Sequence, residues 1–495
     1  MAEKFVRTRQ DMDRWKQKKY GAYYTPTAVV QSLVNWTVRR KTDRMLDPAC
    51  GDGRFLLAHP NSVGVEQDSD AARVVHANKP GSLIHQGEFF AWAGGTCERF
   101  ECAAGNPPFI RYQRFTGDVR DAARGLCARH GAKFSALSSS WAPFIVATAT
   151  VLKRGGRMAF VVPAEIGHAP YATPVLDYLA AHFDFVQIVA IEKKLFPQLS
   201  EDCWLLYAEG YGGHTDHFNL SPMSQFGFMR SPPSLNIHVS VAEWRKANSR
   251  LRTFLLSQDV RDFYDRVAHD PTSGRLGDVA KVGIGYVTGN NSFFHFRPLE
   301  ADLVGIPKVL LQPTVRSGRM LTGRALTDST VEAWRRRDEP NFLLRLRQGC
   351  VLPSPVSRYL DSAEGQKARM AYKCRTRTPW YVVPGVEVPD GFLSYMSGNG
   401  PVLTANRAGC VGTNSVHLVT LKGSMKMPEL QRMWRHAFTR LSCEIEGHPL
   451  GGGMLKVEPG EAARIVLARR KFCSSRDNVR IREGIQTMQR WRHHG

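Results

Sequence analysis

Residues 45 to 56, in the N-terminal half of the chain, read Met45-Leu46-Asp47-Pro48-Ala49-Cys50-Gly51-Asp52-Gly53-Arg54-Phe55-Leu56. An apolar start, a tight glycine-rich turn and a second apolar run predict a buried strand, a turn and the beginning of a helix. Gly51 and Gly53 can adopt positive φ and let the backbone approach a ligand closely. Asp47 and Asp52 would repel a pyrophosphate, and the third glycine of the dinucleotide pattern is missing. We therefore expect a ligand that is partly cationic.

Further strands are predicted around residues 44–47, 62–66, 83–86, 101–105 and 157–162, alternating with helical stretches. This alternation is typical of an α/β fold with a parallel, doubly wound sheet. The second of these strands ends in Glu66, 19 residues after Asp47. In a doubly wound sheet, an acid about 20 residues further on, at the end of a strand, binds ribose hydroxyls. An ordinary surface acid is the alternative for Glu66.

The tetrapeptide Asn106-Pro107-Pro108-Phe109 follows the apolar residues 102–104. The two prolines fix their own φ angles and keep Asn106 out of the helical region, so the turn is stiff. The carbonyl oxygens of Asn106 and Pro107 can then surround one planar group, with the ring of Phe109 to stack on it. Two such acceptors would hold the hydrogens of an exocyclic amine and localise its lone pair, which favours methyl transfer to nitrogen. A Pro-Pro turn without function is the alternative.

In chain order, these motifs resemble those of the adenine-N6 DNA methyltransferases of restriction–modification systems in the gamma arrangement. The resemblance covers roughly residues 20 to 210 and rests on Tyr24-Thr25-Pro26, 47–53, Glu66, Asn106-Pro107-Pro108-Phe109, 141–144 and 157–163. It implies S-adenosylmethionine as cofactor, direct methyl transfer, and a doubly wound seven-stranded S-adenosylmethionine-dependent methyltransferase domain with helices on both faces.

The resemblance also implies roles for single residues. Asn106, Pro107 and Phe109 are implied to be catalytic. Residues implied to bind the cofactor are Tyr24, Thr25, Pro26, Asp47, Ala49, Gly51, Glu66, Glu88 and Phe89. Pro108, Phe109 and Phe196 are implied to contact the target base, with a place in the core as the alternative for Phe196. Two positions depart from the family: Glu88 is one methylene longer than the usual aspartate, and Phe109 replaces a tyrosine, keeping the ring face but losing the hydroxyl.

The N6 amine of adenine is paired inside a duplex, so the target base must be flipped out. Unstacking costs a few kcal/mol, and stacking on an aromatic side chain returns about 1–3 kcal/mol per base. Phe109 and Phe196 are the rings that the resemblance offers for this stacking.

The charge of the chain favours a polyanionic partner. There are 67 Lys and Arg against 45 Asp and Glu, a formal net charge of +22. Residues 1–215 carry +5 of this and residues 216–495 carry +17. A basic excess of this size indicates nucleic acid binding, and no amphipathic basic helix suggests a membrane surface. We expect double-stranded DNA as the partner; the resemblance also allows a cognate restriction endonuclease that acts separately, and the oligomeric state is not indicated.

At 495 residues, the chain is long enough for two or three domains. We predict a catalytic domain over 1–215, a linker over 216–250 and a mixed α+β target-recognition domain over 251–495 with a basic C-terminal segment. Segments 282–294, 375–381, 406–407 and 451–461 resemble the recognition region of larger family members. Arg and Asn can read base edges, although phosphate contacts are commoner for any single arginine. The stretch 469–494 is predicted as a helix on the DNA backbone or as a solvated tail.

Other classes of protein find little support in the sequence. The N-terminus lacks an apolar leader, and the apolar stretch 141–152 is too short to span a bilayer. The 10 cysteines show no paired spacing of the zinc type, so we expect no metal site, reduced thiols and a cytoplasmic location.

Three alternatives to a DNA methyltransferase stay open. Release-factor glutamine methyltransferases share the Asn-Pro-Pro-aromatic turn, but they are shorter and lack a large basic half. Composition does not distinguish an RNA methyltransferase. A DNA-binding protein with an inert methyltransferase fold is disfavoured by the intact Asn106, Asp47 and Glu66. The recognised DNA sequence cannot be read from the chain.

Overall fold

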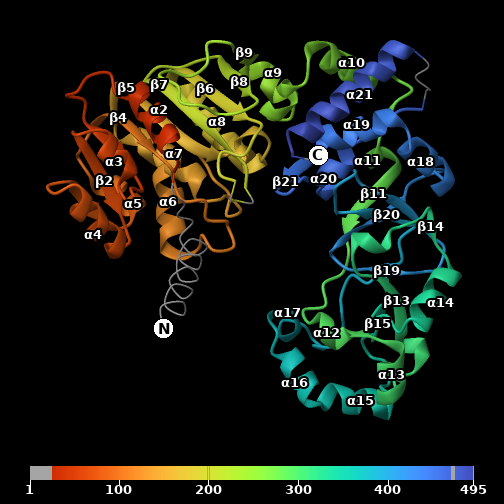
Figure 1. Cartoon of the computed structure of the whole chain (residues 1–495). Helices are drawn as coiled ribbons and strands as arrows, with labels where there is room; N and C mark the ends of the chain where they lie inside the picture. Colours follow the sequence, from red (N-terminus) through yellow and green to blue (C-terminus); the bar gives the residue numbers. More distant parts are fainter. Residues whose placement is uncertain (1–24, 198, 200, 470–473, 494–495) are drawn as a thin grey trace, which may run out of the picture. The chain divides into compact units, whose positions relative to one another are not determined.

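Two units make up the chain in the computed structural model, unit 1 over Met1–Leu256 and unit 2 over Ser257–Gly495. Figure 1 shows their helices and strands. The structure describes residues 25–197, 199, 201–469 and 474–493.

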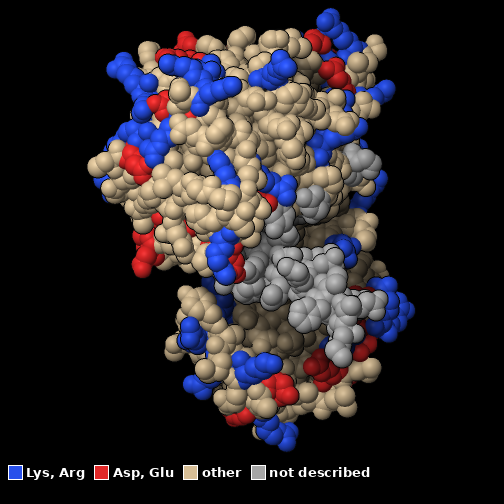
Figure 2. Space-filling model, turned by 60° about the vertical axis from the view of Figure 1, so that its left-hand side comes forward, with Lys and Arg blue, Asp and Glu red and all other residues tan. Residues whose placement is uncertain are grey.

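One face of the molecule shows charged side chains of both signs (Figure 2). On the face drawn in Figure 2, Lys and Arg side chains lie in many places, with Asp and Glu side chains between them. The net charge of +22 is therefore not gathered in one stripe of that face. Among the described residues, no helix has the length and apolar character needed to cross a bilayer.

Unit 1 is built on one sheet, in which the described residues form nine strands in the order β3-β2-β1-β4-β5-β7-β6-β8-β9. The strands are β1 (Met45–Asp47), β2 (Ser62–Glu66), β3 (Leu83–Gln86), β4 (Phe100–Gly105), β5 (Leu152–Pro163), β6 (Phe183–Ile191), β7 (Cys203–Tyr211), β8 (His217–Met223) and β9 (Ile237–Ser240). Strands β1 to β5 run parallel to one another, whereas β7 is antiparallel to both β5 and β6. The five predicted strands are confirmed.

Helices cover both faces of this sheet. They are α2 (Thr27–Thr37), α3 (Arg54–Ala58), α4 (Ser69–Asn78), α5 (Phe89–Gly95), α6 (Gly117–Arg129), α7 (Trp141–Thr150), α8 (Thr173–His182) and α9 (Val241–Lys246), with 3-10 turns η1 (Ala164–Gly167), η2 (Pro170–Ala172) and η3 (Leu251–Leu255). Cys102 and Ala104 of β4 pack with α2 in one core cluster. The alternate residue Ala103 is also fully buried. Because the central parallel strands β1, β2 and β4 are covered on both sides, they are largely apolar, which is why the sequence revealed them.

The segment 216–250, predicted as a linker, belongs instead to the sheet of unit 1. Strand β8 pairs in parallel with β6, and β9 pairs antiparallel with β8. Helix α9 follows, capped by Ser240, and its Trp244 is fully buried with its ring 5.2 Å from that of Phe218. The predicted linker is therefore wrong, and the predicted seven-stranded sheet has two more strands. Neither strand is a continuous apolar run, because β8 contains Asn219, Ser221 and Pro222, and the stretch between them is rich in Ser and Pro, which hid both.

Unit 2 combines small sheets with short helices, a mixed α+β arrangement. Its described residues form sheets in the orders β11-β20-β16-β18-β14, β12-β15-β13-β19, β17-β22-β21 and β10-β23. The strands are β10 (Gly274–Arg275), β11 (Ala280–Ile284), β12 (His295–Phe296), β13 (Leu311–Val315), β14 (Ala325–Leu326), β15 (Phe342–Leu344), β16 (Gly391–Ser394), β17 (Met396–Ser397), β18 (Leu403–Asn406), β19 (Val411–Gly412), β20 (Val416–Leu421), β21 (His448–Leu450), β22 (Met454–Lys456) and β23 (Val466–Leu467).

The helices of unit 2 lie between these strands in the chain. They are α10 (Gln258–Ala268), α11 (Leu276–Val279), α12 (Asn291–Phe294), α13 (Pro298–Val304), α14 (Asp328–Arg336), α15 (Ser354–Asp361), α16 (Ala363–Arg369), α17 (Tyr372–Arg375), α18 (Met427–Trp434), α19 (Ala437–Glu446), α20 (Pro459–Arg464) and α21 (Ser475–Arg490), with 3-10 turns η4 (Lys308–Leu310) and η5 (Gly318–Met320).

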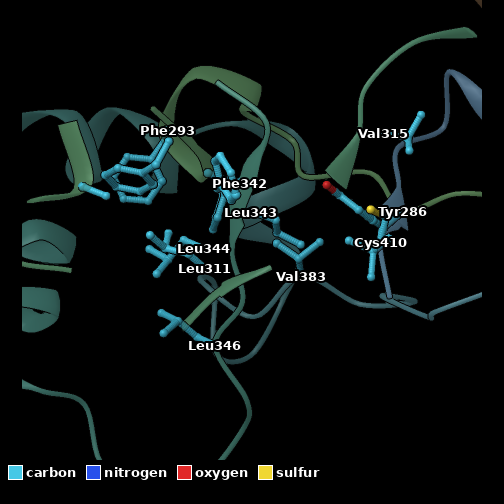
Figure 3. Close-up of a cluster of buried hydrophobic side chains, with 14 of the residues drawn as sticks. Tyr286, Phe293, Leu311, Val315, Phe342, Leu343, Leu344, Leu346, Val383 and Cys410 are labelled. Carbon is cyan, nitrogen blue, oxygen red and sulfur yellow. The ribbon is translucent and has the colours of Figure 1, made fainter. Parts of the chain in front are cut away.

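Hydrophobic clusters among the described residues stabilise unit 2. One gathers buried side chains between Tyr286 and Leu418, and Figure 3 shows the ring of Phe293 near Leu344 and that of Phe342 near Leu343. The other joins residues from α11, β20, α18, α19 and β22. Burial of apolar area at roughly 25 cal/mol per Å² makes such clusters the main source of stability.

The basic C-terminal helix is packed into unit 2. Helix α21 contacts α10 and α19. Arg480 binds both carboxylate oxygens of Asp259 at 2.8 and 2.6 Å. Arg492 is 1% exposed and binds both oxygens of the fully buried Glu444. The prediction that this stretch lies on the DNA backbone or forms a solvated tail is therefore wrong for Arg480 and Arg492. Their guanidinium groups bind carboxylates within unit 2.

Candidate functional site

A cavity of about 340 Å³ opens where β1, β2 and β4 of unit 1 end. Strand β1 pairs with β2 on one side and with β4 on the other, so the order of the strands reverses here. Ligands of open α/β sheets bind at such a switch point, beyond the carboxyl ends of the strands. Of the residues predicted from the sequence, Thr25, Asp47, Ala49, Gly51, Glu66, Glu88, Phe89, Asn106 and Pro108 line this cavity.

The glycine-rich turn after β1 forms one wall and is held by two acids. Asp47 accepts a hydrogen bond from the backbone N–H of Ala49 at 3.2 Å. Glu66 accepts one from the N–H of Gly51 at 2.9 Å and another from the N–H of Asp68 at 2.7 Å. Gly51 has φ +52°, a left-handed conformation that favours glycine. Glu66 thus orients the turn while it lines the cavity.

This wall is strongly acidic. Asp47 is 1% exposed, and burial, reinforced by the negative charges of Glu66 and Asp52, raises its pKa to about 8, although the hydrogen bond from Ala49 opposes the shift. Burial also raises the pKa of Glu66. Carboxyl groups with raised pKa values in a cleft mark candidate functional sites. A cationic ligand group would favour their ionised forms.

A loop clamped by Ser140 carries Asn106 at the end of β4. Nδ2 of Asn106 donates to Oγ1 of Thr25 at 3.2 Å. The hydroxyl of Ser140, at the start of α7, donates to the carbonyl of Pro108 and accepts from the N–H of Ile110 at 2.9 Å. The N–H of Ser140 also donates to the carbonyl of Ile110 at 2.9 Å. Among the described residues, no hydrogen bond reaches the carbonyl of Pro107.

Aromatic rings form the apolar side of the cavity. Phe89 and Phe144 are stacked, with centroids 4.9 Å apart and planes at 17°. Phe90 meets the edge of Phe144 at 4.7 Å, and Phe115 lies beyond it. All four rings line the cavity. The cavity therefore has an acidic wall and an apolar wall, which suits a ligand with one cationic and one flat apolar part.

Glu88 precedes these rings and has a structural role. Its carboxylate accepts a hydrogen bond from the N–H of Ala91 at 2.8 Å and so caps the N-terminus of α5. Acids at this position stabilise a helix through its dipole. Glu88 also lines the cavity.

Some predicted residues are not part of the cavity lining. Pro26, Pro107 and Phe109 do not line it, and Tyr24 lies outside the described residues. Phe109 is partly buried and packs against the core cluster on the α2 side of the sheet. Phe196 is 1% exposed within that cluster, so in this structure both faces of its ring are covered. The burial of Phe196 favours the alternative that it is a core residue over the prediction that it contacts the target base.

Other lining residues were missed in the sequence. Ser140, Phe115 and Arg54 all line the cavity. Arg54 donates to Asp52 at 2.8 Å and to the carbonyl of Thr25 at 3.1 Å, and so connects two of its walls. The serine run 138–140 before an apolar stretch was the available signal, because serine is common at the start of a helix.

Two polar residues in the segments of unit 2 that resembled a recognition region, Arg377 and Asn406, bind the backbone. Arg377 donates to the carbonyls of Val287 and Thr288 at 2.6 and 2.7 Å. Asn406 accepts from the N–H of Cys410 at 2.9 Å and donates to its carbonyl at 2.8 Å. These contacts use guanidinium nitrogens of Arg377 and both amide atoms of Asn406, the groups that would otherwise bind the edge of a base.

Two family models match the sequence. Residues 10–78 match the model of the N-6 DNA methylase family. Residues 248–492 match the model of the C-terminal domain of the type II methyltransferase M.Eco57I. The second match begins within ten residues of the boundary between the units at Leu256–Ser257.

Relatives that span both units are type II methyltransferases. M.AccI of Acinetobacter calcoaceticus is 19% identical over 90% of this chain and 84% of its own length. M.XamI of Xanthomonas campestris pv. amaranthicola is 23% identical over 90% of this chain and 84% of its own. Among solved structures, the type IIL restriction–modification enzyme MmeI in complex with DNA has a TM-score of 0.54 at 12% identity, covering 91% of this chain and 68% of that one. This last likeness concerns the fold.

Proposed function

We propose that this chain, which is a DNA methyltransferase of the restriction–modification type, transfers a methyl group from S-adenosylmethionine to the N6 amine of an adenine flipped out of double-stranded DNA. The observation that carries the proposal is that one cavity is lined both by the acidic turn around Asp47 and Glu66 and by Asn106. A cofactor wall and an amine acceptor thus meet in one place.

The cavity fits S-adenosylmethionine by its chemistry. Its acidic wall suits the cationic methionine end, and Asp47, Ala49 and Thr25 are the residues that we assign to it. Glu66, at the end of β2, is assigned to the ribose, and Glu88, Phe89 and the stacked ring of Phe144 to the adenine end. When bound, this cofactor supplies an electrophilic methyl group on a sulfonium.

Asn106 and Pro107 are assigned to the reacting amine. The Asn106 side-chain oxygen and the Pro107 carbonyl would accept the two N–H groups of the adenine amine. Holding both hydrogens localises the nitrogen lone pair, which is otherwise delocalised into the ring. With a methyl group supplied by the cofactor, the two acceptors would stabilise the positive charge that develops on the amine nitrogen, and the surplus proton of the methylated amine would leave to solvent. The acceptors are fixed before reaction because Ser140 clamps the loop that carries them.

The target base would stack beside Pro108 and Phe109. Flipping the base costs a few kcal/mol, and stacking on one ring returns about 1–3 kcal/mol. Phe109 is only partly buried, which supports this role. Phe196 would have to leave the core to take part, so we assign the stacking to Phe109 alone.

Unit 2 is assigned to DNA recognition. Residues 216–495 carry +17 of the net charge of +22, and most of this segment belongs to unit 2. Positive charge of this kind supports phosphate contacts. A separate endonuclease that cuts the same DNA sequence would be the natural partner of such an enzyme.

The experiment that tests the function uses the full-length chain with S-adenosylmethionine and unmethylated plasmid DNA. Digestion to nucleosides and mass spectrometry should reveal N6-methyladenine, and single-molecule sequencing should place it within one short sequence. The same assay on total RNA tests the RNA alternative, which we expect to give no product. Methylation of RNA, or of no nucleic acid at all, would contradict the proposal.

A further inference from the structure

A second cavity, of about 570 Å³, lies in unit 2 at the end of α18 and the beginning of α19. Figure 1 labels both helices. The loop 399–402 before β18 and residues 322–324 before β14 form its other walls. Leu403, Cys443 and Ile485 supply its apolar part. None of its lining residues takes part in the site of unit 1.

The cavity is lined by Arg324, Arg435 and Arg440, and no Asp or Glu occurs among its described lining residues. All three arginines are exposed, and none of them forms an ion pair within the described part of the chain. Nε of Arg435 donates to the carbonyl of Gln431 at 3.2 Å, which positions its guanidinium. Three like charges around one cavity repel one another unless an anion lies between them.

Other arginines of unit 2 are used differently. Arg492 binds Glu444 at 2.7 Å and Arg464 binds Glu446 at 2.8 Å. Arg377 donates to two backbone carbonyls. Because those guanidinium groups are bound within the protein, the three arginines of the second cavity differ from them in being available to a ligand.

The neighbouring groups are neutral or weakly positive. His436 caps α19, with Nδ1 accepting from the N–H of Phe438 at 3.3 Å. Burial lowers the pKa of His436, which disfavours the charged form of its ring. The indole N–H of Trp434 donates to the carbonyl of Pro401 at 3.0 Å, which fixes this ring as a wall of the cavity. The N-terminus of α19 adds a partial positive charge.

We infer that this cavity binds a phosphate group of the DNA backbone through Arg324, Arg435 and Arg440. The inference rests on the proposed function, since it takes DNA as the ligand of unit 2. Arginine presents a planar fork of N–H groups that matches phosphate oxygens. The cavity is lined by exposed cations, as a contact with a long polyanion requires. Phosphate contacts position a protein without reading sequence, so this cavity would fix the placement of unit 2 on the duplex.

The test compares Arg440→Gln with Arg432→Gln in the full-length chain. Arg432 is exposed on α18 and does not line the cavity, so each variant loses one positive charge from the same region. Duplex affinity is measured over a range of salt concentrations. Arg440→Gln should reduce the slope of log K against log salt by about 1 and weaken cognate and unrelated duplexes equally. Arg432→Gln should leave the slope unchanged. Equal losses in both variants would overturn the inference.

Calorimetry with inorganic phosphate and with a mononucleotide separates DNA from a free anion. If the wild type binds a free phosphate that Arg440→Gln does not bind, while the DNA slope is the same in both, the cavity serves a small ligand and the inference fails. Methylation by the wild type is scored in parallel. A wild type that shows the predicted slope difference but methylates nothing contradicts the proposed function and leaves the phosphate contact in place.

Discussion

Asn106 and Thr25 are joined by a hydrogen bond from Nδ2 of Asn106 to Oγ1 of Thr25 at 3.2 Å, across 81 residues of sequence. The bond turns the amide so that its oxygen faces away from Thr25. The segment before α2 and the loop after β4 are thereby connected, and both line one cavity. The proposed amine acceptor is therefore oriented by a residue from the proposed cofactor wall.

Replacing Thr25 with valine should lower kcat roughly fivefold to tenfold, because a neutral hydrogen bond contributes about 1 kcal/mol and its loss frees the amide to rotate. Thr25→Ser keeps the hydroxyl and is the matched control, with kcat near that of the wild type. Steady-state kinetics under saturating cofactor and DNA measures both. Equal activity of the valine and serine variants would show that the bond does not orient Asn106.

Asp47 should make cofactor binding pH-dependent. Its pKa of about 8 means that the carboxyl group is largely protonated at pH 7 in the ligand-free protein. A bound cation favours the ionised form and lowers this pKa, so binding should release close to one proton, and affinity should rise with pH up to about 8.

Calorimetry at pH 7 in two buffers with different heats of ionisation counts these protons. The ammonium group of the cofactor titrates in the same range, so Asp47→Asn is the control that isolates the protein's share. We expect the variant to bind more weakly and to release about one proton fewer. The same proton count in both proteins would rule out Asp47 as the titrating group.

Ser140 should act as a positioning residue for the loop that carries Asn106. Ser140→Ala removes the hydroxyl that bridges Pro108 and Ile110. We expect kcat to fall about tenfold, corresponding to roughly 1.4 kcal/mol, with KM for both substrates nearly unchanged. Ser138→Ala is a matched control, because the hydroxyl of buried Ser138 has no hydrogen-bond partner among the described residues. A rise in KM without a change in kcat would point to binding rather than positioning.

Truncation at the observed boundary between the units should give a folded fragment, and truncation at residue 215 should not. A fragment ending at Leu256 keeps β8, β9 and the buried Trp244, and we expect it to fold and to bind cofactor without a steep salt dependence of DNA affinity. A fragment ending at residue 215 exposes the edge of β6, and we expect it to aggregate. Circular dichroism and light scattering compare the two. A soluble, folded 1–215 fragment would show that β8 and β9 are dispensable.

The sequence predicted the parts of the fold in which local pattern and burial agree. The strands before Asp47, Glu66 and Asn106 are buried apolar runs that end in polar turns, so both the strands and the residues at their ends could be located. Strands β8 and β9 could not, because neither is a continuous apolar run and β8 contains Asn219, Ser221 and Pro222. The small sheets of unit 2 depend on pairings between distant residues, such as β11 with β20, which no local pattern reveals.

The candidate site was predicted only in part for a similar reason. Asp47, Glu66 and Asn106 line the cavity because Asp47 and Glu66 end strands of one sheet and Asn106 directly follows a third. Ser140 and Phe115 reach it from α7 and from the loop before α6, and only tertiary packing brings them there. Phe196 was misplaced because an aromatic residue in a loop and one in the core look alike in sequence.

The most direct test of the account is Asn106→Ala in the full-length protein, with two quantities measured on the same sample. N6-methyladenine formed in plasmid DNA should fall below detection, because the amine loses its side-chain acceptor. Affinity for S-adenosylmethionine, measured by calorimetry, should stay within a few-fold of the wild type, because the amide is assigned to the base and not to the sulfonium. Retained methylation, or a loss of cofactor affinity as large as the loss of rate, would contradict the assignment.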